Sequence, residues 1–425
     1  MTLSRRRFTT LAGAAGLSVA SPFVRRAEAQ DLAKIGVLLP LSGPLASLGN
    51  EVLRGFQFAR SLVNAGGGVF GRPVEFAQVD VPGSTEATSQ AQRLITSDRV
   101  KVIVGSYASA ISFAASQVAE RNRVVYFEQG AVADDITSRG FKYLFRFIYN
   151  STELGRKCAE YATDRIIPGV GLDRKTAKVA ILNENSNNGT AVGAGAKAWL
   201  DEKGVQVVDH TSYDFKTNDL SSVVQRYKSL NPDILIVEQY TPDAILFWRQ
   251  AREAGLKLKA MIGNGGGHNV NEFAEALGDD VNGIFNTGTS VYINPKALQP
   301  ETAALFKTFH EEYPKMFDGR KPSAHAGMGF NAMYTLLTDI LPAAGGMDTE
   351  KIRQAALALD KPVGSSIVGW GLKFDPKTQN NTRAFPTYDQ WQGRQIRSIG
   401  PDPFGIAEKI TMPLPDWGQR AGVGQ

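Results

Sequence analysis

The hydrophobic pattern of the chain alternates between short apolar runs and longer amphipathic segments from residue 34 onward. Short runs rich in β-branched residues predict buried strands, and segments with apolar residues every three or four positions predict helices. The predicted strands cover residues 34–39, 74–80, 100–104, 124–127, 179–183, 205–208, 234–238 and 259–262. The predicted helices cover residues 49–64, 85–97, 109–120, 152–167, 190–203, 220–230, 242–254, 323–341 and 349–359.

This alternation predicts an α/β fold built from parallel sheets that helices cover on both faces. Because the rhythm restarts after about residue 150, we predict two doubly wound, Rossmann-like lobes rather than one barrel. The segment beyond Trp370 changes to polar loops and short alternating stretches. We expect that segment to return and complete the lobes.

The first 29 residues have the order of a signal peptide. Ser4-Arg5-Arg6-Arg7-Phe8 is followed by the small and apolar stretch Thr9–Ala20 and then by Ala27-Glu28-Ala29, a small-x-small cleavage site. The apolar stretch is shorter than the roughly 20 residues that a membrane-spanning helix needs. The S-R-R-x-F order resembles the twin-arginine type, and an arginine-rich Sec signal is the alternative. We therefore predict export to the periplasm and cleavage near Ala29.

Charge and cysteine content narrow the class of protein further. The chain of 425 residues carries a formal charge of +5, of which the predicted signal accounts for +4 through five arginines and Glu28. A mature charge of about +1 leaves no basic face for nucleic acid or an anionic membrane. Cys158 is the only cysteine, so we expect no intramolecular disulfide and no lipid anchor after the signal. Its apolar helical neighbours predict a buried side chain.

The sequence contains no G-x-S-x-G, H-E-x-x-H, C-x-x-C or Walker A motif. The four histidines, at 210, 268, 310 and 325, show no local metal-ligand spacing. We therefore predict neither catalysis nor a bound cofactor or metal. The acids Glu128 and Glu238, each at the end of a predicted strand, leave a catalytic pair open as an alternative.

Ligands of open α/β sheets bind beyond the carboxyl ends of the strands. Neutral polar residues and glycine dominate these positions, which favours binding over bond-making. The segments that follow the strands are Leu41–Gly43, Ser106–Ser109, Glu128–Val132, Asn185–Gly189, Gln239–Thr241 and Asn264–Gly267.

Several of these segments resemble the leucine/isoleucine/valine-binding type of periplasmic proteins. The opening motif is Ile35-Gly36-Val37-Leu38-Leu39-Pro40-Leu41-Ser42-Gly43-Pro44. The segments 64–68, 71–74, 104–106, 249–256 and 329–332 follow in the order of that family. Each motif is weak alone, but the order extends over about 300 residues.

The resemblance implies two lobes joined by three crossovers, near residues 150, 286 and 365. The N-terminal lobe would comprise 31–150 plus 286–365, and the C-terminal lobe 151–285 plus 366–425. It also implies a small molecule held in the cleft, closure about the crossovers, and delivery to the permease of an ABC importer, as in branched-chain amino acid transport. The alternatives are a sensor clamp that signals to a partner and a secreted enzyme.

The resemblance also assigns roles within the cleft. Ser109 would hold a ligand carboxylate, Gly130 would offer a backbone contact, and Tyr240 would be the cleft tyrosine; Ser42 of the opening motif completes this set.

Three positions depart from the amino-acid binders. Val132 stands where they carry threonine, Asn188 where an aromatic often covers the ligand, and Gly265 where a glutamate receives the ammonium group. A buried ammonium without an acid is costly, although Glu128 or Glu238 could substitute. The ligand is therefore an amino acid, or a carboxylate or amide without an amino group, aromatic acids included.

His325 is the last predicted cleft residue. An apolar aromatic often stands about here in the family, and a histidine adds two ring nitrogens that can bond a second polar end of the ligand. We expect His325→Phe to weaken binding and to flatten its pH dependence between about pH 5 and 8. The alternative is a histidine satisfied within its own lobe.

Overall fold

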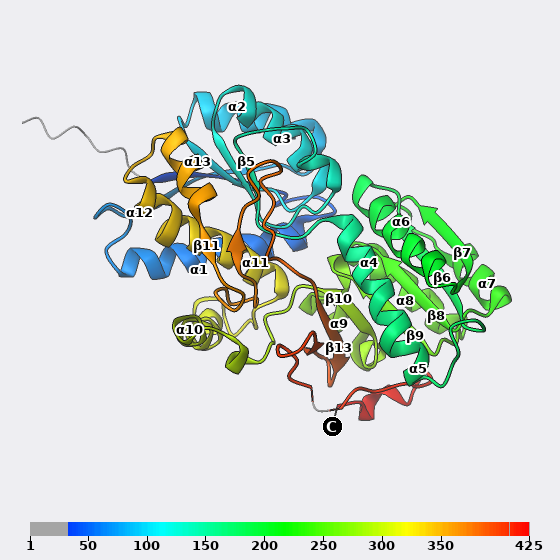
Figure 1. Cartoon of the computed structure of the whole chain (residues 1–425). Coiled ribbons are helices and arrows are strands. Elements are labelled where there is room, and N and C mark those ends of the chain that lie inside the picture. Colours follow the sequence, from blue (N-terminus) through cyan, green and yellow to red (C-terminus); the bar gives the residue numbers. More distant parts are fainter. Residues whose placement is uncertain (1–32, 408, 425) are drawn as a thin grey trace, which may run out of the picture. The chain divides into compact units, whose positions relative to one another are not determined.

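The computed structural model describes residues 33–407 and 409–424, so the predicted signal peptide lies outside the described residues. Two main sheets organise the described chain (Figure 1). The first sheet is parallel throughout, with the order β2-β1-β3-β4-β5. Its strands are β1 (Lys34–Leu39), β2 (Glu75–Asp80), β3 (Val102–Gly105), β4 (Val125–Glu128) and β5 (Leu144–Arg146).

The second sheet has the order β14-β13-β10-β9-β8-β6-β7. It is parallel from β10 to β7, whereas β13 runs antiparallel to both β10 and β14. Its strands are β6 (Lys178–Glu184), β7 (Gln206–Tyr213), β8 (Ile234–Glu238), β9 (Ala260–Asn264), β10 (Phe285–Gly288), β13 (Thr387–Gln392) and β14 (Gln395–Gly400). The prediction of two doubly wound α/β sheets is confirmed.

Amphipathic helices connect the parallel strands, as the alternation of the sequence predicts. Two further helices, α4 and α11, continue through a π-helical turn into α5 and α12. The α-helices are α1 (Ala46–Ala65), α2 (Ser84–Thr96), α3 (Ser109–Arg121), α4 (Ser151–Tyr161), α5 (Ile167–Gly169), α6 (Asn187–Glu202), α7 (Ser221–Leu230), α8 (Thr241–Glu253), α9 (Asn271–Leu277), α10 (Pro300–Met316), α11 (Ala324–Thr335), α12 (Leu341–Ala344) and α13 (Thr349–Ala358).

Helix α11 packs along α1 beside the first sheet, although the two are far apart in sequence (Figure 1). Glycine permits this close approach, because a Cβ at Gly55 would lie 2.1 Å from the carbonyl oxygen of Ala326. The pairing brings the N-terminal end of α11, with His325, to the carboxyl ends of the first-sheet strands.

The C-terminal segment returns to both sheets, as expected. The β13–β14 hairpin extends the second sheet beyond β10. Residues before it lie against the first sheet instead: the Phe374 ring packs edge-on with its centroid 5.2 Å from those of both Phe145 and Phe147, and the backbone N–H of Asn381 donates to Arg146 O at 2.9 Å. A small antiparallel pair, β11 (Asp360–Lys361) and β12 (Leu372–Lys373), precedes this contact.

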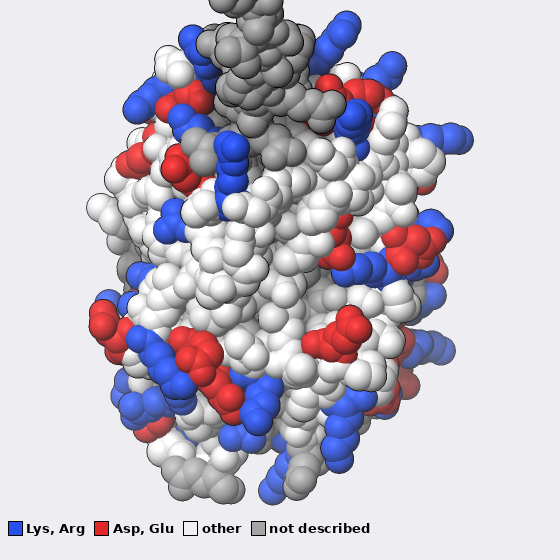
Figure 2. Space-filling view, turned by 90° about the vertical axis from the view of Figure 1, so that its left-hand side faces the viewer, with Lys and Arg blue, Asp and Glu red and all other residues white. Residues whose placement is uncertain are grey.

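The surface view shows basic and acidic side chains interspersed around a broad uncharged area (Figure 2). Such mixing agrees with the near-neutral charge expected of the mature chain. Among the described residues, no helix combines the length and apolar character needed to cross a bilayer.

Candidate ligand-binding site

A cavity of about 40 Å³ lies where the carboxyl ends of strands from both sheets meet. Segments that follow β3, β4 and β5 form one wall, and segments that follow β6, β8 and β9 form the other. Seven of the predicted site residues line it: Ser109, Gly130, Val132, Asn188, Tyr240, Gly265 and His325. The structure thus brings together residues that are up to 216 positions apart in sequence.

Ser42 is the predicted residue that the structure does not bring to this cavity. Its side chain is exposed, and its backbone N–H donates to Oδ1 of Asp80 at 3.1 Å. The same carboxylate oxygen accepts the N–H of Leu41 at 2.8 Å. These bonds hold the loop after β1 against the end of β2, away from the cavity lining.

Ser109 is the first residue of α3, and the cap position before it is Ala108. The Ser109 hydroxyl accepts the N–H of Ala133 at 3.2 Å, so it ties the start of α3 to the loop after β4. Ser109 therefore does not cap its own helix. The N-terminal N–H groups of α3 lie at the cavity wall, where the helix dipole favours an anion.

Glu128 fixes the backbone of both loops that carry this wall. Its Oε1 accepts the N–H groups of Gly130 and Ala131, each at 2.7 Å, and its Oε2 accepts the N–H of Ser106 at 2.6 Å. The Ser112 hydroxyl also donates to Oε2. Burial raises the pKa of Glu128, and these donors oppose that rise. With both oxygens occupied, Glu128 positions the site and is a poor candidate for a ligand ammonium or for catalysis.

Tyr107 is a lining residue that the sequence reasoning missed. Its φ of 79° is sterically costly for a bulky residue, and such strain is typical of functional positions. The Tyr107 ring packs edge-on against His325 with centroids 4.9 Å apart. A Cβ at Gly130 would lie 2.9 Å from Tyr107 Cδ2, so glycine at 130 leaves room for this ring.

His325 lines the cavity, but its predicted titration is wrong. The side chain is buried, and desolvation lowers its pKa to about 3. The imidazole is therefore neutral across the physiological range and cannot cause a pH dependence between pH 5 and 8. A neutral ring still offers one donor and one acceptor nitrogen, and Nδ1 has no partner among the residues that the structure describes.

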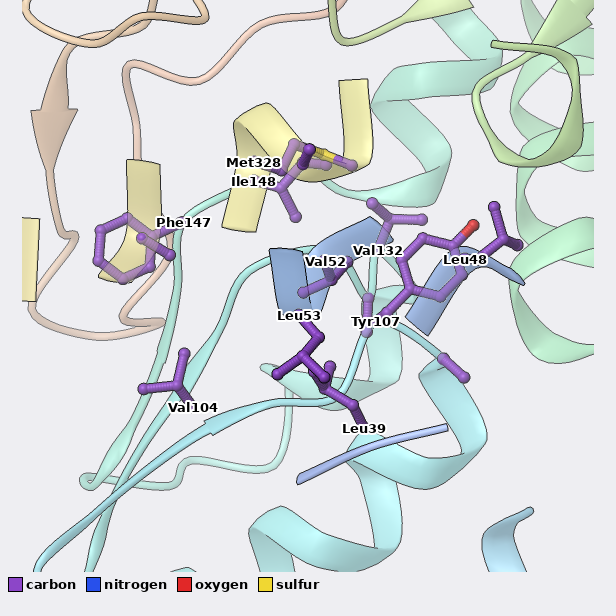
Figure 3. Close-up of a cluster of buried hydrophobic side chains, with 14 of the residues drawn as sticks. Leu39, Leu48, Val52, Leu53, Val104, Tyr107, Val132, Phe147, Ile148 and Met328 are labelled. Atoms are coloured by element: carbon purple, nitrogen blue, oxygen red, sulfur yellow. The ribbon is translucent and has the colours of Figure 1, made fainter. Parts of the chain in front are cut away.

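The apolar part of the wall continues into the hydrophobic core. Tyr107, Val132, Ile148 and Met328 line the cavity and belong to the same buried cluster as Leu48 (Figure 3). Tyr149 and Thr289, which also line it, bond hydroxyl to hydroxyl at 3.2 Å. One side of a ligand would thus contact hydrocarbon, and polar groups would contact its ends.

Asn188 and Glu238 form the polar part of the opposite wall. The Asn188 Nδ2 group donates to Oε1 of Glu238 at 3.0 Å, and Asn188 Oδ1 accepts the Ser151 hydroxyl at 2.9 Å. Both side chains are buried, and Oε2 of Glu238 has no hydrogen-bond partner in the described chain.

Gly265 has φ +42° and ψ −129°, a conformation that suits glycine. A Cβ there would meet only Leu154 Cδ2, at 3.9 Å. The position is therefore open in space but strained for any side chain, and the acid that amino-acid binders carry would not fit this backbone without change.

A larger hollow of about 820 Å³ lies elsewhere on the surface. Charged residues such as Arg54, Arg320 and Arg394 line much of it, and none of the predicted site residues does. Because ligands of open α/β sheets bind at the carboxyl ends of strands, we assign the site to the smaller cavity.

Comparisons with known proteins agree with this geometry. A family model described as periplasmic binding protein matches residues 33–386. The Leu/Ile/Val-binding protein homolog 7 of Brucella suis is 35% identical over 397 residues, covering 93% of this chain and 98% of that relative.

Two solved structures share the fold. The leucine binding protein of Thermotoga maritima is 25% identical with a TM-score of 0.74, covering 86% of this chain and 97% of its own. A solute binding protein from R. palustris in complex with benzoate is 22% identical with a TM-score of 0.74, covering 89% and 99%. The sheets form a type I periplasmic binding protein fold, and the chain belongs to the periplasmic binding protein family.

Proposed function

We propose that this protein is the periplasmic substrate-binding component of an ABC importer and that it captures a small amino acid, or another small carboxylate or amide, in the cavity between the two sheets. The convergence of Ser109, Gly130, Asn188 and Tyr240 on one cavity, from four separate strand ends, carries the proposal. In this role the N-terminal end of α3 and Ser109 hold the ligand carboxylate, because that wall presents N–H donors. The permease is the partner that receives the ligand.

The two sheets serve as lobes in this proposal. The predicted crossovers near 150 and 286 fit the ends of the sheets, but contacts of residues 374–381 with β5 favour a third crossover near 386 instead of 365. Direct bonds already join the lobes: Asn187 Nδ2 donates to Asp135 Oδ2 at 2.8 Å, and Asn271 Nδ2 donates to Lys321 O at 2.9 Å. Closure about the crossovers would form such bonds around a bound ligand.

Export through the twin-arginine route is a separate part of the proposal. We expect Arg5→Lys with Arg6→Lys to block processing of the full-length chain, as judged by its size and by its absence from the periplasmic fraction. Normal periplasmic accumulation of this double variant would contradict the twin-arginine route and leave the binding function intact.

A thermal-shift screen of amino acids, aromatic acids, amides and urea tests the binding function. A ligand at 100 times its Kd stabilises the folded state by about 2.7 kcal/mol, which is readily measured. Stabilisation by at least one of these compounds, with 1:1 stoichiometry in calorimetry, is the expected result. No stabilisation by any of them would contradict the proposed ligand class.

A further inference from the structure

Among the described residues, Glu238 and Asp243 each have one buried carboxylate oxygen without a hydrogen-bond partner, and of these two acids only Glu238 lines the cavity. Its Oε1 accepts Asn188 Nδ2 at 3.0 Å, and its Oε2 is the oxygen without a partner. Glu184 accepts the N–H and hydroxyl of Ser186 and the N–H of Gly189. Asp243 accepts the Tyr213 hydroxyl. Among these three acids, Glu238 is the one that lines the cavity.

The groups that face Glu238 carry no positive charge to balance it. Glu184 at the end of β6 and Asp243 on α8 are acids, and both repel a charge on Glu238. Tyr107, Tyr149, Tyr240 and Cys158 also face it, and burial raises the pKa of each of them.

His325, on the opposite wall, is neutral because burial lowers its pKa to about 3, and the described cavity lining contains neither lysine nor arginine. Burial, and then repulsion by Glu184, raises the pKa of Glu238 well above its usual range.

The repulsion by these acids does not depend on closure of the lobes, whereas Tyr107 and His325 on the other side of the cavity contribute to the burial of Glu238. Glu184, Asn188, Glu238 and Asp243 all belong to the second sheet and the helices that follow its strands. An uncompensated carboxylate in such a place costs several kcal/mol, so burial between the lobes favours the neutral acid at Glu238 while no cation is bound. The same cluster of acids attracts a cation.

We propose that Glu238 receives a cationic N–H group of the ligand and that binding of this group releases one proton from Glu238 to solvent. The Glu238 O–H bond breaks, its proton passes to water and then to buffer, and the ligand ammonium keeps its own protons and donates to the carboxylate. This inference rests on the proposed function, since it concerns the same cavity. It places the acid at the end of β8, where it substitutes for the acid that position 265 lacks.

Calorimetry with matched pairs of probes tests the inference. L-alanine is compared with propanoate, and L-leucine with 4-methylpentanoate, so that each pair differs only in the ammonium group. Titrations at pH 7 in phosphate and in Tris, which differ in ionisation enthalpy, report the number of protons released. We expect the ammonium member of at least one pair to bind, its partner to bind at least tenfold more weakly, and about one proton to be released.

The variant Glu238→Gln keeps the shape of the side chain and removes its charge. It should lose about 10- to 100-fold in affinity for the ammonium probe and release no proton. Glu253→Gln, which changes an exposed carboxyl at the end of α8, should retain both the affinity and the proton release.

The remaining outcomes distinguish failure of the inference from failure of the proposed function. Equal binding of both members of a pair, or binding without proton release, would overturn the inference and leave the proposed function standing. Binding of only an uncharged amide, urea or an aromatic acid would do the same. Failure of every probe in the full panel to bind the wild-type protein would overturn the proposed function itself.

Discussion

The Nδ2 group of Asn188 donates to Oε1 of Glu238 at 3.0 Å in one wall of the cavity. The bond fixes the carboxyl, and Oε2 remains without a partner among the described residues. Asn188 is in turn held by the Ser151 hydroxyl at the start of α4. A polar side chain at 188, in place of an aromatic cover, therefore orients the acid at 238.

Asn188 and Glu238 should act as a coupled pair in binding. We expect Asn188→Ala to lower affinity for an ammonium probe about tenfold, because Glu238 loses the Asn188 donor that holds its carboxyl. In the Glu238→Gln background the same change should cost much less, giving a coupling energy of at least about 1 kcal/mol in a double-mutant cycle measured by calorimetry. Additive effects of the two variants would show that the bond does not orient the acid.

Ser109→Ala should weaken carboxylate binding and also destabilise the protein. Removing the hydroxyl leaves the buried N–H of Ala133 without its acceptor, which costs about 1–3 kcal/mol of folding free energy. Affinity for the carboxylate compound found by screening should fall about tenfold in calorimetry, and chemical denaturation measures the stability loss. Ser89→Ala, an exposed serine on α2, is the control and should change neither quantity. A loss of stability without a loss of affinity would leave Ser109 only a structural role.

His325→Phe should lower affinity without changing its pH dependence. The imidazole has a pKa of about 3 because it is buried, so it stays neutral from pH 5 to 8. The variant keeps a flat ring against Tyr107 but removes both nitrogens. Affinity curves of wild type and variant against pH should therefore run parallel, with the variant curve weaker. Curves of different shape would show that His325 titrates in this range.

Asp389 should make the protein less stable as pH rises. This carboxyl is fully buried, accepts the Thr387 hydroxyl at 3.1 Å, and has its pKa raised to about 7 by desolvation. Because the folded-state pKa lies above the unfolded value of about 3.9, its contribution is fully present below pH 4 and is lost as pH rises through 7. The loss is on the order of 4 kcal/mol.

The variant Asp389→Asn separates this effect from other titrations. The Tm of Asp389→Asn relative to the wild-type Tm should increase from pH 4 to pH 8. The Tm of Glu75→Gln, which changes an exposed carboxyl in β2, should follow that of the wild type. A constant difference between Asp389→Asn and wild type at all pH values would show that Asp389 does not titrate in that window.

The strands that the sequence predicted well are those with continuous apolar runs. Strands β1 and β8 match their predictions to the residue, because both are buried runs with breaks on either side. The elements β10, β13 and β14 were missed, since tertiary pairing rather than local apolar content holds strands such as Phe-Asn-Thr-Gly at 285–288. Helix α10 was missed as well, and it carries Pro314 near its end.

The location of the site followed from the rule that ligands bind beyond strand ends, and the segments chosen by this rule contain half of the residues that line the cavity. Tyr107 was not predicted as a site residue, although the segment Ser106–Ser109 was. The sequence of that segment does not reveal the positive φ of Tyr107. The free oxygen of Glu238 could not be predicted from the sequence either, because it depends on which acid each neighbour bonds. Asn188 donates to one oxygen of Glu238, and Ser186 donates to Glu184 instead. Ser42 was predicted as a site residue because it belongs to the opening motif, but its side chain is exposed in the folded loop.

A crystal structure of the protein with the compound that stabilises it most tests the proposed site most directly. We expect electron density for one molecule between the two sheets, with its carboxylate at Ser109 and the N-terminal end of α3 and with its opposite end near Oε2 of Glu238. Density for the compound in the 820 Å³ hollow beside Arg54 and Arg320, with the cavity between the sheets unchanged, would contradict it.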